Sequence, residues 1–196
     1  MDTIELHRRT VEGFVQRVAT ISEDRWDDPT PCTEWDVRAL VNHVVGEDRW
    51  TAPLLVGKTI AEVGDQFDGD LLGDDPIAAT REAAAEASTA TAELGPAGGK
   101  VHLSYGEEEM DEYLRQLSAD HLIHGWDAAV ATGGDTTLDP ELVSAVASWF
   151  AEREQLYRGA GIIGERVDVA SDDPQARLLA AFGRDPNWSS PPNLRS

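Results

Sequence analysis

The segment from residue 108 to residue 132 constrains the fold of this chain more than any other. Its inward-facing positions alternate at spacings of four and three residues, in the order Met110, Leu114, Leu117, His121, His124, Ala128 and Ala131. A repeat with this period places one continuous seam along one face of an α-helix. A helix of this kind gains most of its stability when that face packs against other helices. The sequence therefore predicts a helical bundle with this segment in its interior.

Other segments supply the partners that such a helix needs. Helical spacing or high helix propensity predicts helices over residues 2–21, 36–50, 76–94, 140–157 and 174–182, and the best strand candidate is 101–105. Asp36 and Asp75 are predicted N-caps, because a short carboxylate can accept the free N–H groups of a first turn. The second helix is expected to end near Trp50, before Pro53.

These elements define the predicted fold class. We expect an all-α protein with minor β structure, built as an up-and-down bundle of four main helices with a short C-terminal appendage. The length of 196 residues suits one domain with a substantial core. The prediction is therefore a single domain over residues 1–196.

The net charge of the chain argues against two classes of binding partner. The formal net charge is -21, and only 16 residues are lysine or arginine. Nucleic acid and anionic membrane surfaces both require clustered positive charge, so neither is an expected partner. The first ten residues lack the order of a secretory signal, and no apolar run approaches the roughly 20 residues that span a bilayer. With a single cysteine, a reducing cytoplasmic location is expected.

Asp120 and His124 are the first candidate site residues. They stand four residues apart on the predicted 108–132 helix, so their side chains project from one face about one turn apart. Two ligands at this spacing can hold one metal ion without strain. A surface pair or a hydrogen-bonded couple would show the same spacing, so the pair alone leaves the metal interpretation open.

His43 is the candidate third ligand. It lies on the predicted second helix, beside the valine stripe and near Trp50. One interpretation is a half-buried histidine that packs against Trp50. The other is that His43 faces Asp120 and His124 from a neighbouring helix, as ligands in helical bundles do. Three protein ligands with an open position are typical of catalytic sites for zinc-like ions.

Further polar residues could support this centre. Three residues are candidates for hydrogen bonds to the metal ligands without binding the metal themselves. They are His121, Asp127 and Glu47, which lies one turn after His43. His121 or Glu47 is our expected general base. Cys32 has no histidine near it in the sequence, and we expect a structural role for it. No phosphate-binding loop and no GxSxG motif is present, which argues against the common nucleotide-binding and acyl-hydrolase classes.

Two longer motifs carry a resemblance to a known family. DDPTPCTEWDVRALVNHVVGEDRW, residues 27–50, and EYLRQLSADHLIHGWDAAVATGGD, residues 112–135, resemble the paired motifs of the mycothiol-dependent maleylpyruvate isomerase-like family, within the DinB-like superfamily. EVGDQFDGDLLGDDP and DDPQARLLAAFGRDP are similar to an actinobacterial subgroup of it. The resemblance covers nearly the whole chain.

The resemblance implies a DinB-like four-helix bundle that holds a divalent metal through His43, Asp120 and His124. It also implies a thiol cofactor such as mycothiol in an isomerase or transferase reaction. An isomerase of this family has glutamate as its acidic ligand and an additional C-terminal domain. This chain has the shorter Asp120 and is too short to contain that domain in full.

Three functional hypotheses follow from the sequence. The first is a metal-dependent enzyme, with zinc or nickel expected ahead of iron or manganese, in which mycothiol attacks a small electrophilic substrate. The second is a hydrolase that uses a metal-bound water and no thiol. The third is a non-enzymatic metal-binding or stress-response protein. Exposed apolar surface on the tryptophan-containing loops leaves a homodimer as an open alternative.

Overall fold

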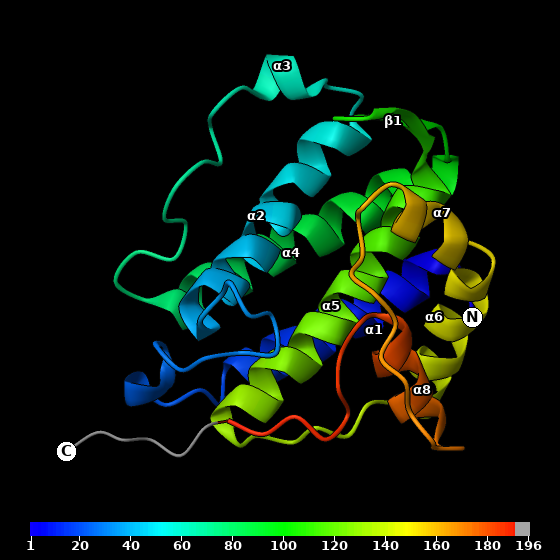
Figure 1. Ribbon diagram of the computed structural model, residues 1–196. Helices are drawn as coiled ribbons and strands as arrows, with labels where there is room; N and C mark the ends of the chain where they lie inside the picture. The colour runs from blue at the N-terminus through cyan, green and yellow to red at the C-terminus, as the bar shows by residue number, and fades with distance from the viewer. Residues whose placement is uncertain (191–196) are drawn as a thin grey trace.

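Four long helices form the body of the protein in the computed structural model, which describes residues 1–190. They are α1 (Thr3–Val18), α2 (Val37–Leu55), α4 (Pro76–Leu94) and α5 (Met110–Thr132). Helix α5 packs against α1 and α2, and α4 packs against the same two helices from the other side (Figure 1). The predicted all-α fold with minor β structure is confirmed.

The helix termini follow the capping residues that the sequence provides. The side chains of Asp36 and Asp75 accept hydrogen bonds from backbone N–H groups of the first turns of α2 and α4, as predicted. Asp2 does the same for α1, so this helix begins at Thr3. Helix α5 ends at Gly133, which adopts the left-handed conformation with φ of 74°. Glycine reaches this region without the steric cost that a Cβ atom would bring.

The four long helices are joined by two reversals of direction and one long return along the bundle (Figure 1). Successive helices reverse direction from α1 to α2 and from α4 to α5, whereas residues 56–75 run back along the bundle so that α4 starts where α2 starts (Figure 1). This return contains the single turn α3 (Ile60–Val63). Between α4 and α5 the chain forms an antiparallel hairpin of β1 (Lys100–Leu103) and β2 (Gly106–Glu109).

Several elements differ from the sequence prediction, among them the helix predicted over 2–21, which ends at Val18. Helix α2 continues through Pro53 to Leu55, because a proline in the last turn removes only one helical hydrogen bond and Leu54 and Leu55 are buried. The predicted helix 140–157 is two helices, α6 (Pro140–Ala151) and α7 (Glu154–Gly159), separated by a bend. The strand β2 was missed because its sequence, GEEE, has low strand propensity.

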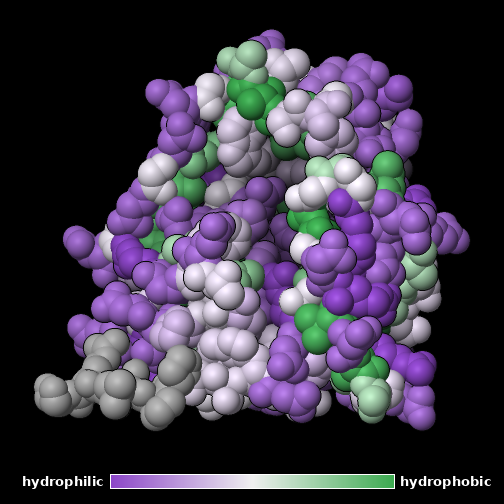
Figure 2. Space-filling view, in the orientation of Figure 1, coloured by the Kyte–Doolittle hydropathy of each residue, from purple (hydrophilic) through white to green (hydrophobic). Residues whose placement is uncertain are grey.

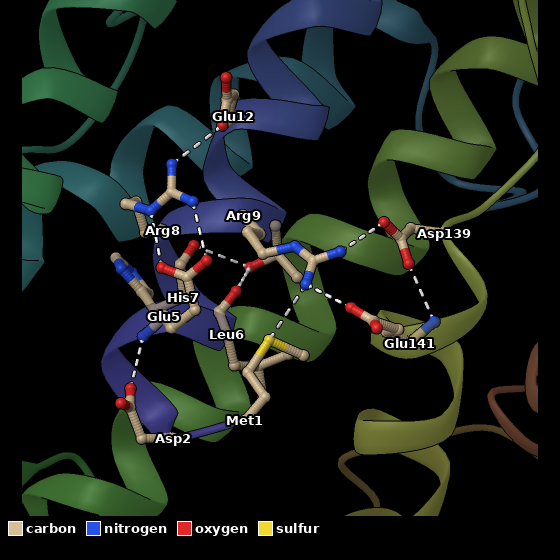
Figure 3. Close-up of polar contacts among 11 residues, drawn as sticks. Met1, Asp2, Glu5, Leu6, His7, Arg8, Arg9, Glu12, Asp139 and Glu141 are labelled. Carbon is tan, nitrogen blue, oxygen red and sulfur yellow. Dashed lines mark hydrogen bonds and ion pairs between the residues drawn. The ribbon is translucent and has the colours of Figure 1, made fainter.

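The C-terminal appendage packs against the bundle through an apolar cluster. Helix α6 and helix α8 (Pro174–Ala181) contact each other, and buried residues of both join those of α5 in one core. A polar link supports this contact, since Arg9 of α1 forms ion pairs with Asp139 and Glu141 at the start of α6 (Figure 3). Among the described residues, no helix combines the length and the apolar character that crossing a membrane would require.

Candidate functional site

A cavity of about 770 Å³ opens on the face of the protein formed by α2, α5 and the C-terminal segment. It is lined by residues of α2, α5 and the loop 31–35, by the turn of the hairpin and by residues of the appendage. In the space-filling view this face is hollowed near its centre, among mixed polar and apolar side chains (Figure 2). A volume of this size suits a small-molecule site.

The three predicted ligands meet on the wall of this cavity that α2 and α5 form. One ligand atom each of His43, Asp120 and His124 lies within 4.8 Å of the other two. Nε2 of His43 is 3.6 Å from Oδ2 of Asp120, and the two imidazole rings are 5.3 Å apart. Ligand atoms 2.0–2.2 Å from a tetrahedral ion stand roughly 3.3 Å from one another. The donor set therefore fits a divalent ion after small side-chain rotations.

The ring of Trp35 holds both histidines in place. Its centroid lies 4.7 Å from that of His43 and 5.7 Å from that of His124. Trp50, the partner considered for His43 in the sequence, contacts Phe67 instead. His43 therefore lies against an aromatic wall of the cavity and faces the two residues of α5.

Electrostatic coupling within this cluster favours its charged forms. Burial alone would raise the pKa of Asp120, but its polar contact with His43 and the nearby charge of His124 outweigh burial, so the pKa is lowered. Burial would lower the pKa of His43, but Asp120 outweighs it and the pKa is raised. Asp120 is thus ionised and available as a ligand near neutral pH, where a metal would displace the proton that His43 gains.

Asp127, which the sequence suggested as a residue that supports the ligands, lies within hydrogen-bond distance of His124. Its carboxylate is fully buried, and Oδ2 lies 3.1 Å from Nδ1 of His124. This contact orients the imidazole ring and directs its Nε2 atom away from Asp127. Hydrogen bonds of this kind set which nitrogen of a histidine can bind a metal.

Two partly buried residues, Cys32 and Arg184, complete the polar network around Asp127. The guanidinium group of Arg184 donates to Asp127 at 2.8 Å and to Sγ of Cys32 at 2.9 Å, and the thiol lies 3.5 Å from Asp127. Burial, with Asp127 adding to it, raises the pKa of Cys32 to about 12. The thiol is therefore protonated and a poor nucleophile.

Cys32, His124 and Asp127 form a second group with ligand-like spacing. The positive charge beside this group is Arg184, which already contacts Cys32 and Asp127. A metal ion between them would meet that guanidinium group, so this group fits a cation less well than His43, Asp120 and His124 do. Sequence reasoning missed the roles of Cys32 and Arg184, because they stand 95 and 57 residues from Asp127.

His121 and Glu47 lie apart from the cavity. The ring of His121 is buried in the bundle core, where Nδ1 is 2.6 Å from the carbonyl oxygen of Leu117 and Nε2 is 3.0 Å from Oδ1 of Asp48. Burial, followed by the charge of Asp120, raises the pKa of Glu47. Neither side chain is among the residues that line the cavity, so the geometry offers no direct support for either as a general base.

Fold and site together define a helical-bundle protein with a His–Asp–His cluster facing a small-molecule cavity. The chain belongs to the family described as the mycothiol maleylpyruvate isomerase N-terminal domain, which it matches over residues 7–129. It is also 33% identical over 184 residues to two Mycobacterium tuberculosis proteins, the uncharacterized proteins MT0763 of strain CDC 1551 and Rv0738 of strain H37Rv. Each match covers 93% of this chain and 97% of the relative. No solved structure matches the chain significantly.

Proposed function

We propose that this protein is a metal-dependent enzyme that uses a low-molecular-weight thiol, mycothiol, in an isomerase or transferase reaction on a small electrophilic substrate. The observation that carries the proposal is the convergence of His43, Asp120 and His124 on the wall of an open cavity. The thiol in this proposal rests on family membership, because the family description names mycothiol. Zinc or nickel suits two imidazoles and a carboxylate.

The residues of the site have distinct tasks in this proposal. His43, Asp120 and His124 hold the ion, and Asp127 orients His124 through Nδ1. Arg184 fixes Asp127 from the C-terminal segment. When bound, the ion supplies positive charge that stabilises a thiolate or polarises a substrate carbonyl. The open side of the cluster faces the cavity, where a thiol and a substrate can meet.

Elemental analysis by inductively coupled plasma mass spectrometry tests the metal site. Wild-type protein and the variants His43→Ala, His124→Ala and His102→Ala are purified, supplied with zinc or nickel and freed of excess ion. We expect about one ion per chain in wild type, as one three-ligand site holds one ion. His102 lies on β1 outside the cluster, so its variant is the matched control and should retain the ion.

The outcomes separate this proposal from its rivals. Loss of the ion in both site variants, with helical content retained by circular dichroism, supports the site. Absence of the ion from wild type after loading refutes it. With a loaded protein, activity that requires mycothiol supports the thiol-dependent reaction, whereas hydrolysis without added thiol would assign the site to a metal-activated water.

A further inference from the structure

The wall of the cavity that contains His43, Asp120 and His124 is polar, whereas the wall formed by α6, α7 and the residues after them is largely apolar. This difference bears on which substrate the cavity can bind. We propose that the electrophile bound here has an uncharged apolar body, aromatic or branched aliphatic, and is not a diacid of the maleylpyruvate kind. The inference rests on the proposed function, because it concerns the substrate of that site. It depends on the part of the cavity wall that α6, α7 and residues 162–184 form, which lies beyond the matched family segment of 7–129.

Aromatic residues form one side of this part of the cavity. Trp149, Tyr157 and Phe182 line the cavity, and Phe150 packs behind them with its ring 4.2 Å from that of Phe182. Trp149 and Tyr157 meet edge to face at 5.9 Å. Rings that pack in this way form a rigid apolar surface.

The polar atoms of this wall are already engaged away from the cavity. Nε1 of Trp149 donates to Glu112 at 3.0 Å, and the hydroxyl of Tyr157 donates to the same carboxylate at 3.2 Å. Arg153 also donates to Glu112, which is not among the residues that line the cavity. Trp149 and Tyr157 therefore present carbon surface to a ligand, and their N–H and O–H donors are already engaged with Glu112.

The rim of the cavity exposes apolar side chains on an anchored segment. Ile162 is 57% exposed and Ile163 packs partly against the core beside it. The backbone N–H of Ile162 donates to the carbonyl of Tyr157, and Arg158 donates to the carbonyls of Gly164 and Ala181. The segment around Ile162 is thus held in place, with the side chain of Ile162 exposed to solvent. A bound apolar group would cover this side chain.

The lining of the cavity has no free lysine or arginine side chain, among the described residues, that could pair with the second carboxylate of a diacid. Among the described residues that line the cavity, Arg184 is the only lysine or arginine, while Glu34 and Asp120 are acidic. The guanidinium group of Arg184 is committed to Asp127, to Cys32 and to the carbonyl of Phe182. A metal ion could meet one carboxylate, but a second would lose its hydration without gaining a cationic partner.

Binding to the metal-free full-length chain tests this inference separately from the proposed function. The probes are benzylacetone, which carries a carbonyl and an apolar ring, acetone, which lacks the ring, and the dianion maleate. None requires a thiol, and without metal no divalent ion contributes to the binding of maleate. Titration calorimetry should show benzylacetone binding at least about ten-fold more tightly than either of the others.

A matched pair of variants assigns the binding to the proposed wall. Ile162→Asp places a charge at the rim, and Val56→Asp does so at an equally exposed valine that does not line the cavity. We expect Ile162→Asp to weaken benzylacetone binding about ten-fold and Val56→Asp to leave it unchanged. Ile162→Lys should weaken it as well, because the probe is uncharged.

Either of two results would overturn the inference. One is maleate binding as tightly as benzylacetone, and the other is benzylacetone affinity that is equal in wild type and Ile162→Asp. Failure of metal loading would refute the proposed function and leave these affinities standing. Conversely, a loaded, thiol-dependent enzyme with no preference for the apolar probe would refute only the substrate class.

Discussion

Replacing His7 with leucine should change how the stability of this protein depends on pH. His7 is fully buried in α1, and among the described residues neither ring nitrogen has a hydrogen-bond partner. Its ring meets that of His121 edge to face at 5.7 Å. Burial, and then the charge of His121, lowers the pKa of His7 to about 3. The histidine is therefore neutral in the folded protein at pH values at which it is protonated in the unfolded chain.

The sign and size of the effect follow from this difference. The unfolded chain binds a proton at His7 near pH 6.5, whereas the folded protein does not until about pH 3. Stability is therefore lost as the pH falls below 6.5. Each pH unit in this range corresponds to about 1.4 kcal/mol, so the loss at pH 5 is about 2 kcal/mol. His7→Leu removes this contribution and also removes two buried polar atoms without partners.

Urea unfolding at pH 8 and pH 5, followed by circular dichroism on metal-free protein, measures the effect. Wild type should lose about 2 kcal/mol more than His7→Leu between the two pH values. The raised pKa values of His43 and His121 act in the opposite direction, but both proteins contain these residues and the comparison subtracts them. His102→Ala, at a partly exposed histidine, should behave as wild type. Equal losses in wild type and His7→Leu would refute the reasoning.

Three other substitutions test separate parts of the structure. Asp127→Asn should weaken zinc binding roughly 10–100-fold in a chelator competition assay, because His124 loses its orienting carboxylate, and unchanged affinity would contradict that role. Arg9→Ala should lower the urea midpoint only slightly, and less at high salt, since its partners are exposed and screened by solvent; a large shift of the midpoint would contradict this. Gly133→Ala should lower stability by about 1 kcal/mol, as alanine is strained at a φ of 74°; an unchanged urea midpoint would count against this.

Local signals made much of the fold predictable from the sequence. Asp75 followed by Pro76 marked the start of α4, and the glycine after Thr132 marked the end of α5, because capping depends on residues adjacent in the chain. The break between α6 and α7 lacked such a signal. It coincides with the contacts of Trp149, Arg153 and Tyr157 to Glu112, which lies on a different helix. Tertiary contacts of this kind have no local pattern in the sequence.

Part of the candidate site was likewise predictable from local spacing in the sequence, and part was not. Asp120 and His124 could be paired from the sequence, because helical spacing fixes their relative position, and His43 followed from the helix expected to face them. The network of Asp127, Cys32 and Arg184 could not be assembled, since its members come from three segments whose contact depends on the packed fold. The glycine and proline that flank the Arg184–Asp185 pair indicate only a turn.

The metal-ligand candidates and the apolar wall lie in different parts of the chain, which explains why family membership does not identify the substrate. His43, Asp120, His124 and Asp127 all lie within the matched segment 7–129, whereas the apolar wall and Arg184 lie beyond it. The matched segment therefore supplies the residues that could hold a metal, and the C-terminal segment supplies the surface that a substrate body would contact. Because Arg184 binds Asp127, the two parts are joined at the residue that orients His124. A change in the C-terminal segment could thus alter substrate preference while the His–Asp–His cluster stays the same, which is how one metal centre can serve different substrates.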